Sequence, residues 1–445
     1  MTSPDLSCVL SLYQRVLPAG VIEYFAQQAD LRSRRGIYSV AVVLWLMMVQ
    51  RWQRGGTLAS SVQHLVQGTT RGLLGNCKRV REGRISARTG GYCQARRRLP
   101  KRIAEQVTDE IVERLRAQLS EPFPGLDRPV LLLDGSSLQL EHNRELVKAY
   151  PPGHNQHGTN HWPVVRVVVF HDVGSGLAQR PCWGPMYGPQ AVSEQALAEA
   201  AMDRLPTGAV VMGDRNFGIF SIAWAAAQRH HPMVLRLTKE RAQRLVGEIT
   251  APREWEVGWH PSRWDRVKRG SWPGEAEVRG RVIAGRIGRG KSKTWLYLFT
   301  TLELPGEQVM ALYGRRWNIE TDLRSLKQTV RLQHLTAKTV DMMEKELLLA
   351  VSAYNLVRAV MCLAAREAQI DPRQLSFTQV LNVVNCAWPR LVGAVTEAEH
   401  DREFQRVLRI AAQCTLPKRK KQRSYPRAVW SHGSSFPTRK PEKTK

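Results

Sequence analysis

Four short aliphatic runs between residues 121 and 239 place the strongest constraint on how this chain can fold. They are rich in β-branched or other aliphatic side chains, as buried strands are, and they cover Val130–Leu133, Val164–Phe170, Ala209–Met212 and Met233–Leu237. Helical stretches at Glu194–Arg204 and Phe217–Arg229 lie among them. Strands that alternate with helices in this way predict an α/β fold with mixed strand connections.

The segments on either side differ from this region, and a chain of 445 residues is long enough for several parts. Residues 1–120 are expected to be mostly helical, because apolar residues recur there at helical spacing, as in Ile103, Val107 and Ile111. Residues 240–293 are rich in glycine and alternate in polarity in places, which predicts a β-rich insertion rather than a continuation of the core.

Beyond the insertion the α/β pattern resumes. A strand-like run at Trp295–Thr300 precedes two long helices, expected at about Glu307–Leu332 and Met342–Ala365. The last thirty or so residues are rich in Pro, Ser, Lys and Arg, which is typical of a poorly ordered basic tail. The expected divisions are a helical N-terminal region at 1–120, an α/β core in two parts at 121–239 and 294–400, the insertion at 240–293, and a basic C-terminal segment at 401–445.

The charge of the chain predicts a polyanionic partner. Lys and Arg number 66 against 39 Asp and Glu, a formal net charge of +27, and counterion release from nucleic acid favours binding by such a chain. Charge alone does not separate DNA from RNA. Basic residues are concentrated at 71–102, where Glu82 is the one acid and Arg96, Arg97 and Arg98 stand in a row. We interpret this segment as a DNA contact rather than an ordinary solvated surface.

The cysteines and apolar segments bear on where the protein works. The seven cysteines are scattered without a CxxC pair, which argues for a reducing compartment and against a disulfide scaffold or a cysteine-bound zinc site. The apolar run Val40–Val49 is too short to span a bilayer and lies too far from the start for a signal peptide. We therefore interpret it as a buried helix and expect a cytoplasmic protein without a membrane partner.

Two aspartates stand directly after strand-like runs, Asp134 in VLLLDGSS and Asp214 in AVVMGDRNFG. The end of a strand fixes a carboxylate rigidly, and the glycine or polar turn beside it leaves the carboxylate open to solvent. For either residue alone, an aspartate that caps the next turn or helix is the common alternative. Two such positions in one basic α/β region favour a two-metal site, which needs carboxylates from separate elements converging on ions roughly 4 Å apart.

A third carboxylate is predicted in the helical segment ALYGRRWNIETDLRSLKQTVRL. On an ideal helix, offsets of 3, 7 and 14 from Tyr313 place Arg316, Glu320 and Lys327 with it inside an arc of about 60°. Asp322 points roughly the other way. Ion pairs at helical spacing are the simpler interpretation, but they do not explain why a phenol, two cations and a carboxylate share one face across four turns.

That face suits phosphoryl transfer on DNA. Glu320 would complete the metal coordination begun by Asp134 and Asp214, while Arg316 and Lys327 would hold phosphates beside the scissile bond. Tyr313 would orient one of these two basic side chains. Arg215, next to Asp214 in DRNF, is a further candidate DNA contact.

The pattern Tyr-x2-Arg-x3-Glu-x6-Lys, present here as YGRRWNIETDLRSLK, resembles the signature of the insertion-sequence-four group of DDE transposases, which includes the transposase of the Tn-five element. The DG-type first motif, DRNF as the second, and GGYCQARRRLP ahead of them are also similar to that family, and the resemblance covers most of the chain. Ser136 stands where many relatives carry Thr, a mild departure.

The resemblance implies an RNase H-like catalytic core, interrupted between the second aspartate and the glutamate by a β-rich insertion, which is where 240–293 lies. It also implies two Mg²⁺ ions, with Mn²⁺ as a substitute, bound by Asp134, Asp214 and Glu320. The implied partner is double-stranded DNA, as transposon inverted-repeat ends and as target, bound by a synaptic homodimer. Movement would follow a cut-and-paste route through a hairpin at the transposon end.

Several other candidates are set aside. His154, His157 and His161 lack a matching fourth zinc ligand and are interpreted as a polar loop near the active site or DNA. Asp172 is followed by VGSG, which predicts a hairpin turn, and Asp203 falls within a helical run and is expected at the surface.

Two questions stay open at this point. Trp255, Trp259, Trp264 and Trp272 crowd the insertion, and one of them could stack on a base flipped out at the hairpin, although packing is the simpler role for each. For the whole chain, the alternatives to a transposase are a nuclease that hydrolyses DNA without strand transfer and an inactive DNA-binding relative. An intact acidic triad argues against the inactive relative.

Overall fold

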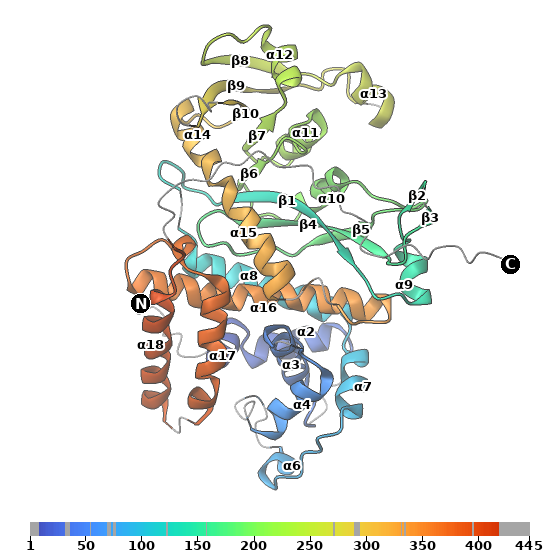
Figure 1. The fold of residues 1–445 in the computed structure, drawn as a ribbon, viewed down its shortest axis with the longest axis vertical. Helices are drawn as coiled ribbons and strands as arrows, with labels where there is room; N and C mark the ends of the chain where they lie inside the picture. The colour runs from blue at the N-terminus through green and yellow to red at the C-terminus, as the bar shows by residue number, and fades with distance from the viewer. Residues whose placement is uncertain are drawn as a thin grey trace, which may run out of the picture.

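The computed structural model describes residues 9–417, except 32–35, 54, 69–72, 74–76, 122, 157, 270–271, 289–293, 331, 333–334 and 394–395. It has a mixed α/β fold, in which one large sheet lies on a layer of long helices and smaller helices pack below them (Figure 1). The basic tail beyond residue 417 and His157 lie outside the described residues.

The N-terminal region is helical, as expected. Its described helices are α1 (Val9–Val16), α2 (Ala19–Gln28), α3 (Val40–Trp52), α4 (Leu58–Val66), α6 (Lys78–Arg81), α7 (Gly90–Arg98) and α8 (Lys101–Leu119). The apolar run predicted as a buried helix is α3, which begins at a Ser39 side chain that accepts a hydrogen bond from the Val42 amide. The inward face of α8 carries Ile103, Val107 and Ile111, each fully buried.

The main sheet has eight strands in the order β5-β4-β1-β6-β7-β10-β9-β8. They are β1 (Val130–Gln139), β4 (Val164–Asp172), β5 (Cys182–Pro185), β6 (Val210–Gly213), β7 (Met233–Leu237), β8 (Arg253–Trp259), β9 (Val278–Ile287) and β10 (Thr294–Thr300). Strands β1, β6 and β7 are parallel, and the other pairs are antiparallel, so the predicted mixed connections are confirmed. A separate pair is formed by β2 (His154–Asn155) and β3 (Gly158–Thr159).

Helices and turns connect and cover the strands. They are α9 (Arg144–Ala149), α10 (Glu194–Met202), α11 (Phe220–Gln228), α12 (Lys239–Val246), α13 (Arg263–Arg269), α14 (Gly306–Gly314), α15 (Asn318–Arg324), α16 (Val340–Glu367), α17 (Phe377–Gly393) and α18 (Glu397–Gln413). A 3-10 turn, η2 (Arg315–Trp317), and a π-helical turn, η3 (Ser325–Thr329), flank α15, and a 3-10 turn, η5 (Pro372–Gln374), precedes α17.

Residues 240–293 contain the predicted strands, but they do not form a unit apart from the core. Strand β9 pairs with β8 on one side and with β10 on the other, and β10 pairs with β7. The segment therefore continues the main sheet by antiparallel addition, and it also carries α13. The predicted separation from the core is wrong. A change of amino-acid composition indicates that the strands differ in sequence, but it does not indicate which strands they pair with.

Two further expectations need correction. The helix predicted at about Glu307–Leu332 is divided into α14, η2, α15 and η3. The boundary expected at residue 401 falls inside α18, which begins earlier because Thr396 and Glu399 form a reciprocal capping box.

Three apolar clusters hold these layers together. One face of the sheet packs on α10, α11 and α12, while the other face packs on α14 and α15. The largest cluster joins α16 and α8 to the N-terminal helices, to α17 and α18, and to parts of β1 and β4. Helix α16 is long and apolar enough to cross a membrane, but 94% of its most apolar 18-residue stretch is buried inside the protein. It is the core helix that these layers share (Figure 1).

Candidate active site

The sheet register places Asp134 and Asp214 side by side. In the parallel pairing of β1 with β6, Leu133 lies opposite Gly213, and each aspartate is the next residue along its strand. Parallel strands lie about 4.8 Å apart, so the two backbones are neighbours at this level. Asp214 follows β6 directly, as predicted. Asp134 does not follow a strand: β1 continues through it to Gln139, because β4 pairs with β1 over that whole length.

Strand alternation turns both aspartates toward the same helices. On β1, Leu132 belongs to the cluster under α14 and α15, whereas Leu133 belongs to the cluster on the opposite face. On β6, Met212 likewise faces α14 and α15. Side chains two residues apart share a face, so Asp134 and Asp214 continue the rows of Leu132 and Met212. Both carboxylates therefore point to the face that the predicted signature helix covers.

The signature residues lie on the segment that covers this face. Tyr313 is buried near the end of α14, and Arg316 lies in the 3-10 turn η2. Glu320 is in α15, and Lys327 is half-buried in the π-helical turn η3. Asp134 acts electrostatically on Lys327, and Arg316 and Asp214 act on Tyr313. The structure thus brings these residues together, although the segment is not the single ideal helix from which their shared face was predicted.

The two aspartates are fixed by local hydrogen bonds. The Gly135 amide donates to Asp134 Oδ1 at 2.8 Å, and the Asn216 amide donates to Asp214 Oδ1 at 2.8 Å. Burial, aided by the negative charges of Asp214 and Glu194, raises the pKa of Asp134 to about 6 against the opposing effects of the Gly135 amide and Arg316. The fold therefore holds a carboxylate here at an electrostatic cost.

The neighbouring phenol and ammonium respond to the same burial. Burial raises the pKa of Tyr313 to about 12, so the phenol stays protonated at neutral pH and can donate a hydrogen bond. Burial lowers the pKa of Lys327, and the nearby Asp134 carboxylate opposes that shift. Arg236 on β7 lies beside Tyr313 on the same face of the sheet. It is a basic residue of the site that no sequence motif indicated.

Glu194 is another residue of the site that no sequence motif indicated. It is the first residue of α10, and its Oε2 accepts a hydrogen bond from Asn216 Nδ2 at 2.6 Å. Its carboxylate lies against the backbone next to Asp134: a Cβ built on Gly135 would be 2.7 Å from Glu194 Cδ. A side chain at residue 135 would displace the Glu194 carboxylate from this position. The glycine that follows Asp134 was the available signal, but it did not indicate which side chain would fill the space.

The donor set suits a hard divalent cation, with one adjustment. Asp134 and Asp214 offer oxygen ligands that such ions prefer, and binding would offset the cost of holding both charges. Among the residues that the structure describes, however, no three His, Cys, Asp or Glu side chains are close enough to enclose an ion. Glu320 instead faces Arg316 at 3.7 Å, with 41% of its side chain exposed. A contact this long and this exposed holds Glu320 weakly.

The carboxylates that were set aside occupy other places. Asp322 is buried in an ion pair with Arg373, whereas Glu320 is partly exposed, so the two carboxylates lie on different sides of α15, as predicted. Asp172 accepts hydrogen bonds from the Ser175 amide and hydroxyl, which confirms the predicted turn. Asp203 follows α10 at the surface, where it pairs with Arg229.

The predicted N-terminal DNA contacts divide into two groups. Arg97 and Arg98 are exposed at the end of α7, and Arg215 is exposed beside Asp214. Arg96 is buried, and its Nη2 lies 2.5 Å from Glu346 Oε1 on α16. The expectation that Arg96 contacts DNA is therefore wrong. Each residue turns the side chain by about 100° around a helix, and in α7 Arg96 falls on the same packed side as Tyr92, four residues earlier, whereas Arg97 and Arg98 do not.

The tryptophans of the insertion also divide. Trp259 is buried against Phe299, and Trp272 packs edge-on against Phe220, so both are packing residues. Trp264 on α13 is 60% exposed. Trp317, in the turn between Arg316 and Asn318, is 63% exposed and was not singled out from the sequence.

Two carboxylates on neighbouring parallel strands, under a helix that carries a third, define an acidic site of the DDE type. The family model described as a transposase DDE domain matches residues 125–356, and the chain belongs to this family. The sequence is also 27% identical over 316 residues to the transposase InsG for insertion sequence element IS4 of Escherichia coli (strain K12), covering 69% of each chain. The protein is a DDE-type transposase similar to that of IS4, and transposases of this kind generally use divalent metal ions.

The raised pKa of Asp134 leads to a prediction for the metal-free protein. A folded-state pKa of about 6, above the ordinary aspartate value of 3.8, means that stability is lost as pH rises between these values. Asp134→Asn avoids that loss, so in EDTA at pH 7.5 it should be more stable than the wild type by about 1–3 kcal/mol. At pH 5 the gain should fall by about half. Urea unfolding at both pH values measures it, and equal stability of the two proteins would contradict the burial cost.

Proposed function

We propose that this transposase binds the inverted-repeat ends of its insertion sequence, cleaves them and joins them to target DNA. The observation that carries the proposal is the placement of Asp134 and Asp214 side by side beneath the segment that bears Glu320. The exposed basic residues of a chain with net charge +27 support DNA as the partner. The strand order β5-β4-β1-β6-β7 supports an RNase H-like core.

Asp134, Asp214 and Glu320 would hold two Mg²⁺ ions, for which Mn²⁺ would substitute. When bound, such ions activate the attacking oxygen and stabilise the leaving one. Glu320 would first exchange Arg316 for the metal site, and Arg316 would then be released to contact a phosphate. Lys327 and the protonated Tyr313 would contact phosphates from the same side, and Arg215 from the loop after Asp214.

The remaining features concern assembly. Arg97 and Arg98 would contact the inverted repeat, together with the exposed basic residues of the same region, which are Lys78, Arg79, Arg84, Arg88 and Arg102. A homodimer would bring two ends together, and cleavage would pass through a hairpin on the transposon end. An enzyme that acts on bacterial DNA would work in the cytoplasm, at the nucleoid. A nuclease without strand transfer is the second candidate, and joining assays separate it from the transposase.

The first test replaces the three carboxylates singly. Asp134→Ala, Asp214→Ala and Glu320→Ala should each reduce cleavage of a duplex carrying the repeats that flank the gene by at least about 1,000-fold, because metal coordination needs all three. Binding of the same duplex should stay within about threefold of wild type. Gel assays of cleavage, strand transfer and binding measure these effects. Undiminished cleavage in EDTA would remove the metal from the proposal, and cleavage without joining would favour the nuclease.

The second test uses the burial difference within the arginine row. Arg97→Ala combined with Arg98→Ala should weaken binding of the duplex and reduce the slope of log affinity against log salt by about two, because each arginine would neutralise one phosphate. Arg96→Ala is the control, because it removes one positive charge of the same row from a buried site. It should lower the melting temperature and leave the salt slope unchanged. An unchanged slope in the double variant would show that these arginines do not contact DNA.

The third test asks which indole holds a flipped base. Trp264 and Trp317 are the exposed candidates, and stacking on a base is worth roughly 1–3 kcal/mol. Alanine at the stacking position should slow hairpin formation by about tenfold or more and leave the rate of the first nick unchanged, because only the hairpin step unstacks a base. Trp259→Phe serves as the packing control. Denaturing gels resolve the products. If both alanine variants keep or lose both steps together, neither indole holds a base.

A further inference from the structure

Helix α15, which carries Glu320, is not held by a continuous helical ladder. It has seven residues and lies between the 3-10 turn η2 and the π-helical turn η3. The segment packs into different surroundings along its length. Ile319 of α15 packs in the small cluster under the sheet, whereas Leu326 of η3 packs in the large helical cluster. Apolar packing supplies no directional bond, so a directional contact would fix the rotation of α15, and with it the position of Glu320, more closely than packing alone.

The described residues supply such a contact on the opposite side of α15. Asp322 is buried, with 3% of its side chain exposed, and it is paired with Arg373 of η5. Arg373 Nη1 lies 2.6 Å from Asp322 Oδ1 and 2.5 Å from Oδ2. Charge-assisted hydrogen bonds of this kind are short and strongly directional. Because Asp322 is two residues from Glu320 on the same short helix, the rotation that aligns one carboxylate also sets the other.

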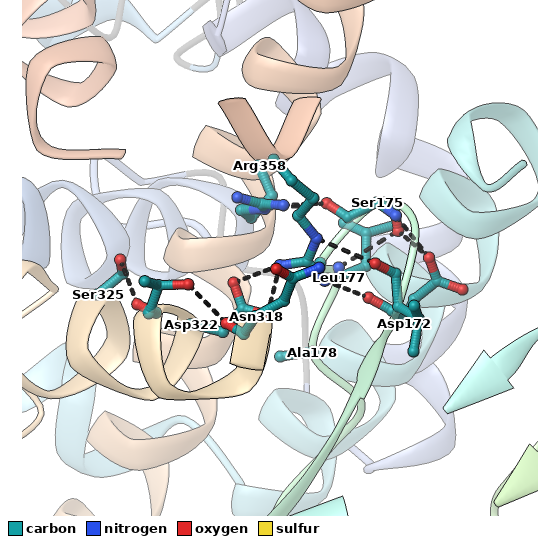
Figure 2. A network of polar contacts seen from close by, with 12 residues as sticks. Asp172, Ser175, Leu177, Ala178, Asn318, Asp322, Ser325 and Arg358 are labelled. Carbon is teal, nitrogen blue, oxygen red and sulfur yellow. Dashed lines mark hydrogen bonds and ion pairs between the residues drawn. The ribbon is translucent and has the colours of Figure 1, made fainter. Parts of the chain in front are cut away.

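Arg373 is itself fixed by the turn that follows β4. Its Nη2 donates to the Asp172 carbonyl oxygen at 2.7 Å, and its Nε donates to the Val173 carbonyl oxygen at 3.0 Å. Helix α16 holds the rest of that turn: Arg358 Nε donates to the Ser175 carbonyl oxygen at 2.9 Å. Figure 2 shows Asp322 and Arg358 approaching the turn with Asp172 and Ser175 from two different helices. The contact on α15 is thus anchored to the end of a central strand.

The anchoring arginine lies beyond the matched DDE region, which ends at residue 356. Turn η5 is tied to the end of α18, because the Leu416 amide donates to the Gln374 carbonyl oxygen at 2.6 Å and the Ser376 amide to the Cys414 carbonyl oxygen at 2.7 Å. The C-terminal helices therefore hold the backbone from which Arg373 reaches α15.

We propose that Arg373 is a positioning residue for Glu320, acting through Asp322. Its fork-shaped guanidinium joins α15 to the turn after β4 and sets the rotation that lets Glu320 reach the metal site beside Asp134 and Asp214. The inference rests on the proposed role of Glu320 as a metal ligand. It predicts that the C-terminal segment, outside the DDE region proper, determines how completely the acidic site is assembled.

The test measures metal binding in the full chain by two readouts. The first is the Mn²⁺ concentration that gives half-maximal cleavage of a duplex with the flanking repeats. The second is Fe²⁺-dependent hydroxyl-radical cleavage of the protein chain, which cuts the backbone near bound metal and needs no DNA. Arg373→Ala should raise the half-saturating Mn²⁺ at least tenfold. It should lose the chain cut near residue 320 and keep the cuts near residues 134 and 214.

Two further variants separate positioning from general stability. Arg373→Lys keeps the charge but not the fork, so it should shift the Mn²⁺ requirement by an intermediate amount even if Arg373→Ala does not fold. Asn355→Ala removes two 2.8 Å hydrogen bonds between α16 and Ala178, at the far end of the same turn, without touching α15. It should lower the melting temperature and leave both metal readouts unchanged. If Asn355→Ala shifts them as much as the Arg373 variants do, or the Arg373 variants match wild type, the proposal is wrong.

Failure of the underlying function is recognised separately. The wild type should be cut near residue 320, and Glu320→Gln should abolish that cut. If the wild type shows no such cut, or Glu320→Gln leaves it unchanged, Glu320 is not a metal ligand and the proposed function fails along with this inference. If Glu320→Gln abolishes the cut and Arg373→Lys and Arg373→Ala leave it intact, only the positioning role of Arg373 fails.

Discussion

The parallel register between β1 and β6 is the constraint on which the rest of the site depends. Leu133 opposite Gly213 puts Asp134 and Asp214 next to each other, and strand alternation turns both to one face. A slip of one residue in either strand would send one carboxylate to the opposite face of the sheet. Because both faces are packed, the apolar rows on each side fix this register strongly. The acidic pair is therefore positioned by the hydrophobic core and not by contacts of its own.

The same burial that fixes the aspartates also disfavours their charge. Partial desolvation is the main cost, and repulsion between two neighbouring carboxylates adds to it, which is why the pKa of Asp134 rises to about 6. Arg316 and Lys327 lie close enough to offset part of that cost. A divalent cation would offset more of it. Under the proposed metal-binding role, stability and activity make opposite demands at Asp134.

The sequence predicted the strands and the helical N-terminal region, because these depend on local periodicity. It also predicted that Asp322 points away from Glu320, since two residues turn a helix by about 200°. It could not predict that β1 continues past Asp134, because that depends on β4 as a pairing partner. Glu194 was missed for the same reason: it reaches the site from a helix that begins sixty residues after Asp134, and no local pattern reports that contact.

Helix α16 explains why this chain behaves as one structure despite its change of composition near residue 120. Glu346 forms an ion pair with Arg96, and Lys345 Nζ donates a hydrogen bond to the Leu99 carbonyl oxygen at 2.8 Å. The end of α7 is therefore tied to α16 by buried polar contacts. Farther along, Arg358 holds the turn after β4. Buried charges that lose a partner are destabilising by about 3–5 kcal/mol, so these contacts resist separation. The helix that carries Arg97 and Arg98 is consequently joined to the helix that braces the turn after β4.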